Sequence, residues 1–110
     1  MAHEWVAGRI KGLYWLEAHI TKIYFRQGTA TLFFVCGLSS EILEIEFLNC
    51  QSLYLSMYVM EEGQIGHIEL STNEQGQVLT LFDNYSGERC GELVFESARH
   101  RSTGKVWVYG

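Results

Sequence analysis

Apolar and polar residues alternate along several short stretches of the chain, as expected of strands with one buried face. In residues 41–47, Leu43, Ile45 and Phe47 point one way while Glu44 and Glu46 point the other, because successive side chains of a strand lie on opposite faces. Residues 53–59 alternate in the same way. Residues 31–35 are apolar on both faces, which predicts a central strand covered on two sides.

The apolar runs are separated by glycine-containing turns, and the chain has no proline. We expect a hairpin connection at 26–28, a polar loop at 71–76 and a turn at 83–87. A helix fits at 10–17 or at 95–101, although neither segment has a clear cap and apolar stripe. The predicted strands cover residues 19–25, 29–36, 41–47, 53–59, 65–70, 78–82, 90–96 and 105–109.

The length of 110 residues predicts one domain spanning residues 1–110. Hydrophobic residues make up 47% of the chain, enough to close a core without metal or disulfide bonds. We therefore predict a mostly β domain, an antiparallel β-sandwich or partly open barrel with room for one short helix.

The three cysteines, Cys36, Cys50 and Cys90, are widely spaced and have no partner Cys or His at ligand spacing. This pattern predicts buried reduced thiols rather than a disulfide framework or a zinc site. The first residues lack the features of a signal peptide, and no apolar run approaches the ~18 residues of a membrane span. We expect a cytoplasmic protein that binds no membrane and no cofactor.

Catalytic constellations are not recognisable in the chain. Its four histidines are scattered and it contains no phosphate-binding glycine loop. His67 and Glu69 share one face of a predicted strand and form a conceivable acid–base pair, although a solvated polar face explains them more simply. The net charge of −5 opposes direct nucleic-acid binding. We therefore predict a binding protein rather than an enzyme.

Charge is distributed very unevenly along the sequence. Residues 41–96 contain eleven acids and one base, a net charge of −10, whereas the remaining segments contain two acids and seven bases, a net charge of +5. If the strands of 41–96 lie side by side, the potentials of their carboxylates add within a Debye length of about 8–10 Å. Acids that only keep the domain soluble and discourage edge-to-edge pairing are the simpler alternative.

A basic partner would relieve this repulsion and would be steered to the acidic surface. The acids that we expect to contact it collectively, through Arg and Lys of the partner, are Glu41, Glu44, Glu46, Glu61, Glu62, Glu69, Glu92 and Glu96.

Two segments carry a family resemblance. Residues 14–23, Tyr-Trp-Leu-Glu-Ala-His-Ile-Thr-Lys-Ile, resemble the opening of small bacterial immunity-type β domains, and residues 47–53 resemble their mid-domain Phe-x-Asn-apolar segment. The chain departs from that pattern at Leu16, where His is frequent, and at Glu17, where Asp is usual. The resemblance implies a monomer that neutralises a basic toxin in a 1:1 complex. It implies a nuclease (RNase) as the toxin, as in contact-dependent growth inhibition, and it transfers no contact residue.

Two other functions remain open from the residues alone. A small-molecule-binding domain or enzyme would place His67 and Glu69 in a pocket between the sheets. A structural or assembly module would expose an apolar patch around Trp107 and Tyr109.

Overall fold

The fold is known from a computed structural model, which describes residues 3–5, 17–35, 42–57, 59 and 63–102. These residues form antiparallel strands in two sheets, so the predicted mostly β, antiparallel architecture is confirmed. The strands are β1 (His3–Trp5), β2 (His19–Arg26), β3 (Thr29–Val35), β4 (Ile42–Leu48), β5 (Ser52–Leu55), β6 (Ile65–Asn73), β7 (Gly76–Asp83), β8 (Arg89–Phe95) and β9 (Ser97–Ser102).

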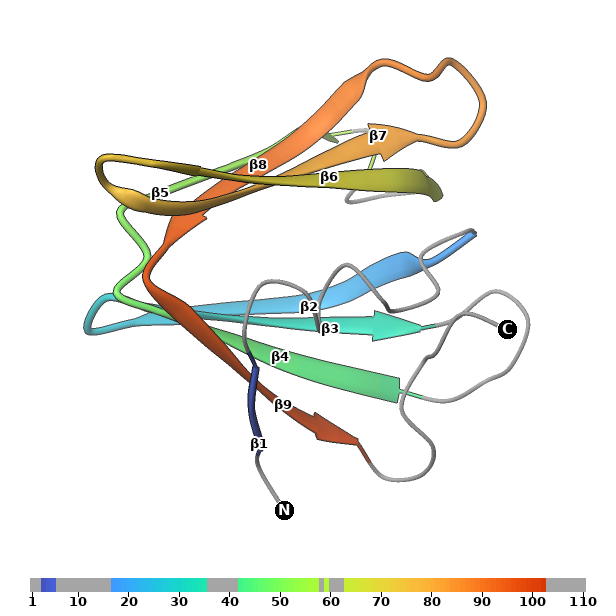
Figure 1. The fold of residues 1–110 in the computed structure, drawn as a ribbon. Coiled ribbons are helices and arrows are strands. Elements are labelled where there is room, and N and C mark those ends of the chain that lie inside the picture. Colours follow the sequence, from blue (N-terminus) through green and yellow to red (C-terminus); the bar gives the residue numbers. More distant parts are fainter. Residues whose placement is uncertain (1–2, 6–16, 36–41, 58, 60–62, 103–110) are drawn as a thin grey trace.

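The two sheets face each other as the layers of a sandwich (Figure 1). One sheet has five strands in the order β1-β9-β4-β3-β2, and the other has four in the order β5-β8-β7-β6. The sandwich is not closed into a barrel. One isolated bridge, between Ala18 and Ile65, connects the segment before β2 with the start of β6.

At one corner of the sandwich, two antiparallel chain segments pass together from one sheet to the other (Figure 1). β4 continues into β5 while β8 continues into β9, and the segments pair on both sides of the bend. Across the bend the Gln51 N–H donates to Val94 O at 2.7 Å, and the Glu96 N–H donates to Leu48 O at 2.9 Å. Asn49 takes the left-handed conformation, with φ of 50°, which Asn adopts more readily than most residues. We call residues 48–52 and 94–97 the corner.

Tight hairpins join the strands within each sheet. The β2–β3 turn has positive φ at both central residues, 52° at Gln27 and 80° at Gly28, which is the type I′ geometry that matches strand twist. The β6–β7 hairpin is tighter than predicted, since the strands continue to Asn73 and Gly76. Asn73 Oδ1 accepts the N–H groups of Gln75 and Gly76, so residues 71–76 are not a long loop.

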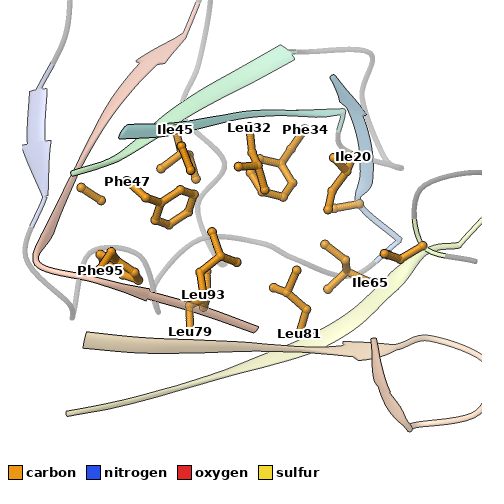
Figure 2. Close-up of a cluster of buried hydrophobic side chains, with 14 of the residues drawn as sticks. Ile20, Leu32, Phe34, Ile45, Phe47, Ile65, Leu79, Leu81, Leu93 and Phe95 are labelled. Carbon is orange, nitrogen blue, oxygen red and sulfur yellow. The ribbon is translucent and has the colours of Figure 1, made fainter. Parts of the chain in front are cut away.

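The space between the sheets is filled by apolar side chains from both layers (Figure 2). Phe47 of β4 and Phe95 of β8 meet edge to face, with ring centroids 4.9 Å apart. Their burial, together with that of the aliphatic side chains, provides the main favourable free energy of folding. The fully buried large side chains are Phe34, Phe47, Phe95, Leu32, Leu43, Ile45, Ile65, Leu79, Leu81 and Leu93.

Several sequence predictions need correction. Residues 95–101 are not a helix but the end of β8, the bend at Glu96 and β9. The strand predicted at 53–59 ends at Leu55, because Ser56 Oγ accepts the Val59 N–H at 3.2 Å and starts a helical turn that includes Met57 and Val59. Of the helix predicted at 10–17, residues 10–16 lie outside the described residues, as does the strand predicted at 105–109.

Candidate protein-binding surface

The two sheets differ strongly in charge. Residues 65–95, which form β6, β7, β8 and their hairpin loops, contain five acids and one base, a net charge of −4. The strands of the five-stranded sheet and the β2–β3 turn contain three acids and four bases, a net charge of +1. Among the described strands, the two layers of the sandwich therefore differ in net charge, although Glu44 and Glu46 of the acidic segment 41–96 belong to the five-stranded sheet.

Glu44 and Glu46 lie on the outer face of the five-stranded sheet, as alternation predicted, but not beside the acids of β6 and β8. Their cross-strand neighbours on β9 are Arg101 and Arg99. Arg99 Nη2 donates to Glu46 Oε2 at 3.0 Å, and the Glu46 side chain is only 13% exposed. The charge of Glu46 is therefore largely compensated within this sheet.

The outer face of the four-stranded sheet brings together Glu69 and Glu92. A row of cross-strand partners runs from Glu69 through Thr80 and Glu92 to Tyr54. With strands about 4.8 Å apart, the two Glu Cα atoms lie roughly 10 Å from each other, which is about one Debye length. We call this outer face, bearing Glu69, Thr80, Glu92 and Tyr54, the acidic face.

The next row of cross-strand partners on the acidic face contains His67, Phe82 and Arg89. His67 stacks on Phe82, with centroids 4.4 Å apart and planes 2° from parallel, and its Nε2 is 4.0 Å from Glu69 Oε2. Arg89 Nη1 donates to Glu92 Oε2 at 3.2 Å. His67 and Glu69 do share one strand face, but their side chains are 58% and 68% exposed, so they line no cavity between the sheets.

Among the remaining predicted contact acids, Glu96 is described by the structure and lies apart from the acidic face. Glu96 is at the corner, where its Oε2 accepts the Asn49 Nδ2 donor at 2.7 Å. The other three, Glu41, Glu61 and Glu62, lie outside the described residues. Of the eight predicted acids, the structure thus brings Glu69 and Glu92 together on one face.

An open depression of about 470 Å³ lies next to the acidic face, where β5, the β7–β8 loop and the start of β8 meet. We call it the end pocket. Tyr54 and Tyr85 present aromatic rings at it, with residues 49% and 70% exposed. Sequence reasoning identified the 83–87 turn but not this pocket, since its parts come from segments about 30 residues apart. Its lining residues are Tyr54, Ser56, Asp83, Tyr85, Ser86, Glu88, Arg89 and Cys90.

Asp83 organises the loop beside the end pocket. It is 6% exposed, and its Oδ2 accepts the backbone N–H groups of Tyr85 and Ser86 and the Ser86 hydroxyl. These bonds favour the ionised carboxylate. The Ser86 N–H is the largest cause that lowers the pKa of Asp83 below its usual value, with the Ser86 hydroxyl and the Tyr85 N–H adding to it against the opposing effect of burial. Asp83 is therefore a carboxylate at neutral pH.

The lowered pKa of Asp83 predicts a specific pH dependence of stability. Its stabilising contribution is fully present above the unfolded-state pKa of about 3.9 and is lost as pH falls through the lower folded-state pKa. Asp83→Asn keeps an acceptor oxygen but loses the charge, so it should cost about 1–2 kcal/mol at pH 7, and this difference should shrink below about pH 4. Urea unfolding across this pH range measures it, with Glu69→Gln as a control of equal charge change. A difference that stays constant down to pH 2.5 would contradict the assignment.

Cys50 and Cys90 are free and buried, as predicted, and Cys36 lies outside the described residues. Burial raises the pKa of both thiols, and for Cys90, where the charge of Asp83 adds to the effect, to about 11. Such thiols are protonated at neutral pH and poor nucleophiles.

The outer face of the five-stranded sheet also has a depression, of about 270 Å³ near the β2–β3 turn. Arg26 and Glu46 both line it, together with Tyr24, Gln27, Thr29 and Thr31. Opposite charges meet there and the surrounding sheet is nearly neutral. This second depression therefore indicates no preference for a charged partner.

Comparison with known protein families, with curated proteins and with solved structures finds no match for the chain. Among the described residues, no group of three or more His, Cys, Asp or Glu side chains is placed to hold a metal ion. No helix in the described ranges is both long and apolar enough to cross a membrane.

Proposed function

We propose that this domain is an immunity-type protein that binds a basic protein toxin in a 1:1 complex in the cytoplasm. The toxin is a nuclease (RNase) whose cationic active site the acidic face covers in place of nucleic acid. The activity is binding, without turnover of a substrate. The resemblance of residues 14–23 and 47–53 to immunity-type domains motivates the class of partner.

The observation that carries the proposal is the concentration of negative charge on one layer, −4 on residues 65–95 against +1 on the five-stranded sheet. Carboxylates on a layer of net negative charge repel each other in the free protein, a cost that the pairing of Glu92 with Arg89 offsets only in part. A basic partner removes that cost and is attracted before contact, which raises the association rate. The partner surface must therefore be rich in Lys and Arg.

The exposed tyrosines beside the carboxylates strengthen a binding function over a purely solubilising one. Tyr54 belongs to the acidic face and Tyr85 to the adjoining loop. Tyrosines are enriched at the energetically important centres of protein interfaces, whereas acids that only maintain solubility require no aromatic neighbours. An acidic surface with two accessible tyrosines thus favours a protein partner.

The two other functions receive less support. The apolar filling between the sheets and the outer position of His67 and Glu69 weigh against a pocket-based enzyme or small-molecule carrier built on that pair. Trp107 and Tyr109, the basis of the assembly module, lie outside the described residues.

The test is to express the product of the reading frame beside this gene and measure its activity with and without this protein. We expect a basic nuclease that is inhibited at a 1:1 molar ratio. Isothermal titration at rising salt should show affinity that falls steeply, because the attraction is electrostatic. A neighbouring product that is acidic, or that binds with affinity independent of salt, would contradict the proposal.

A further inference from the structure

We propose that the end pocket is a receptor for one cationic side chain, a lysine or arginine, of the partner protein. The inference rests on the proposed function for the identity of the partner, but the pocket itself is testable without the partner. The side chain's charge is held by Asp83 and Glu88, and its stem is flanked by Tyr54 and Tyr85.

One oxygen of the buried Asp83 carboxylate is available to accept a hydrogen bond from a ligand. Oδ2 carries all three hydrogen bonds of the turn, whereas Oδ1 is buried and meets no donor from the part of the chain that the structure describes. A buried polar atom without a partner is costly, and this one belongs to a residue that lines the end pocket. A cationic N–H donor that enters the pocket would form a charge-assisted bond with it.

Asp83 remains able to interact with a charged ligand because it lines an open depression. The groups that bond its Oδ2 belong to its own turn, namely the Tyr85 and Ser86 N–H groups and the Ser86 hydroxyl. Desolvation of the carboxylate is therefore outweighed by the hydrogen bonds that stabilise its charge. An ionised carboxylate that lines an open depression is a suitable counter-charge for an ammonium or guanidinium group.

The aromatic residues of the pocket suit the same ligand. The protein's own Arg89 already places its guanidinium carbon 5.5 Å from the Tyr54 ring centroid, a cation–π distance. Arg89 forms an ion pair with Glu92, so among the described charged residues that line the pocket it is Asp83 and Glu88 that have no ion pair within the described ranges. Tyr85, 70% exposed, offers a second aromatic side chain for the stem of an incoming Lys or Arg.

Other ligand classes fit the end pocket less well. Two uncompensated carboxylates repel phosphate and other anions. A metal ion needs several converging ligands, and the described residues hold no group of three or more His, Cys, Asp or Glu placed for one. The volume of about 470 Å³ lies within the roughly 300–1,000 Å³ of ligand pockets, which accommodates a single long side chain.

The experiment is an NMR titration of the full chain with N-acetyl-arginine amide, using amide signals of the folded protein as readout. The matched probe is N-acetyl-citrulline amide, which has nearly the same shape but no charge. We expect saturable shifts at Tyr54, Tyr85, Ser86 and Arg89 with the arginine probe and not with the citrulline probe. Asp83→Asn, which keeps the acceptor for the turn, should weaken binding about tenfold.

Two further variants complete the test. Glu69→Gln removes one charge from the acidic face outside the end pocket and should change the dissociation constant less than about twofold. Tyr85→Ala alters an exposed residue and should weaken binding about two- to fivefold, so it serves even if Asp83→Asn disturbs folding. Equal shifts with both probes, shifts without saturation, or equal affinity of Asp83→Asn and Glu69→Gln would overturn the proposal.

The titration separates this inference from the proposed function. If arginine binds at the end pocket but the protein inhibits no nuclease, the end pocket remains a receptor for a cationic side chain, and the proposal that the partner is a nuclease toxin is rejected. If the protein inhibits the nuclease but binds no arginine, the proposed immunity function remains, and the proposal that the end pocket receives a side chain of the toxin is rejected.

Discussion

Phe47→Ala is expected to lower the free energy of unfolding by about 3–5 kcal/mol, the usual cost of truncating a buried phenylalanine. Phe47 is fully buried on the five-stranded sheet and meets Phe95 of the opposite sheet edge to face at 4.9 Å. The substitution leaves a cavity where the two layers meet and removes the aromatic contact. Because small domains are stable by only about 5–15 kcal/mol, the variant should be near its unfolding threshold.

Phe25→Ala is the matched control for this prediction. It removes the same atoms from the same sheet, but Phe25 is 59% exposed, so its cost should stay below about 1 kcal/mol. Urea denaturation at neutral pH compares the two variants directly. Equal losses for Phe47→Ala and Phe25→Ala would show that the packing between the sheets is not what holds the domain together.

Reversing the two charges of the acidic face, with Glu69→Lys and Glu92→Lys together, is expected to weaken toxin binding about 100-fold at low salt. The change places two positive charges where the basic partner approaches, so association slows and contacts become repulsive. It also removes the partner of Arg89, which adds to the positive potential. Stopped-flow mixing with the toxin, at 20 and at 300 mM salt, measures the association rate.

The same reversal on the opposite sheet, Glu44→Lys with Glu46→Lys, identifies the face that binds. It changes the net charge equally, but Glu44 and Glu46 lie beside Arg101 and Arg99 on the five-stranded sheet. We expect a reduction of less than about tenfold, which reflects overall charge. Each variant is first compared with wild type by urea unfolding, since loss of the Arg99–Glu46 pair affects stability. A larger effect from Glu44 and Glu46 would move the interface to the five-stranded sheet.

The alternation of residues predicted which way most strand side chains point, but not which strands share a sheet. Leu43, Ile45 and Phe47 are buried and Glu44 and Glu46 face outward, as predicted. β4 and β6, however, have similar alternation and belong to different sheets. Sheet membership is decided by long-range pairing through the corner, which has no local signature beyond the turn-forming character of Asn49.

β9 was not predicted as a strand because its sequence is polar. Only Ala98 among residues 97–102 is apolar, and it is fully buried where β9 pairs with Phe47 of β4. A strand with a single apolar residue shows no alternation of apolar and polar positions by which it could be recognised. Arg99 of β9 pairs with Glu46 on the five-stranded sheet, and the segregation of charge by sequence position did not reveal this compensation.

The end pocket was not predictable for a related reason. Tyr54 and Tyr85 are on different segments, and each alone is an ordinary exposed tyrosine. Asp83 was recognised as a turn residue, which it is, since it accepts the Tyr85 and Ser86 N–H groups. Its second role depends on the packing of β5 against β8, which the local sequence does not encode.

The corner also has a consequence for how fast the chain folds. Its contacts join residues far apart in sequence, since Asn49 and Glu96 are separated by 47 positions. Closing such loops costs entropy before any contact is gained, and proteins dominated by non-local pairings fold over milliseconds to seconds. The β4–β9 pairing of one sheet and the β5–β8 pairing of the other flank the corner, so we expect formation of the corner to be the slow step of folding.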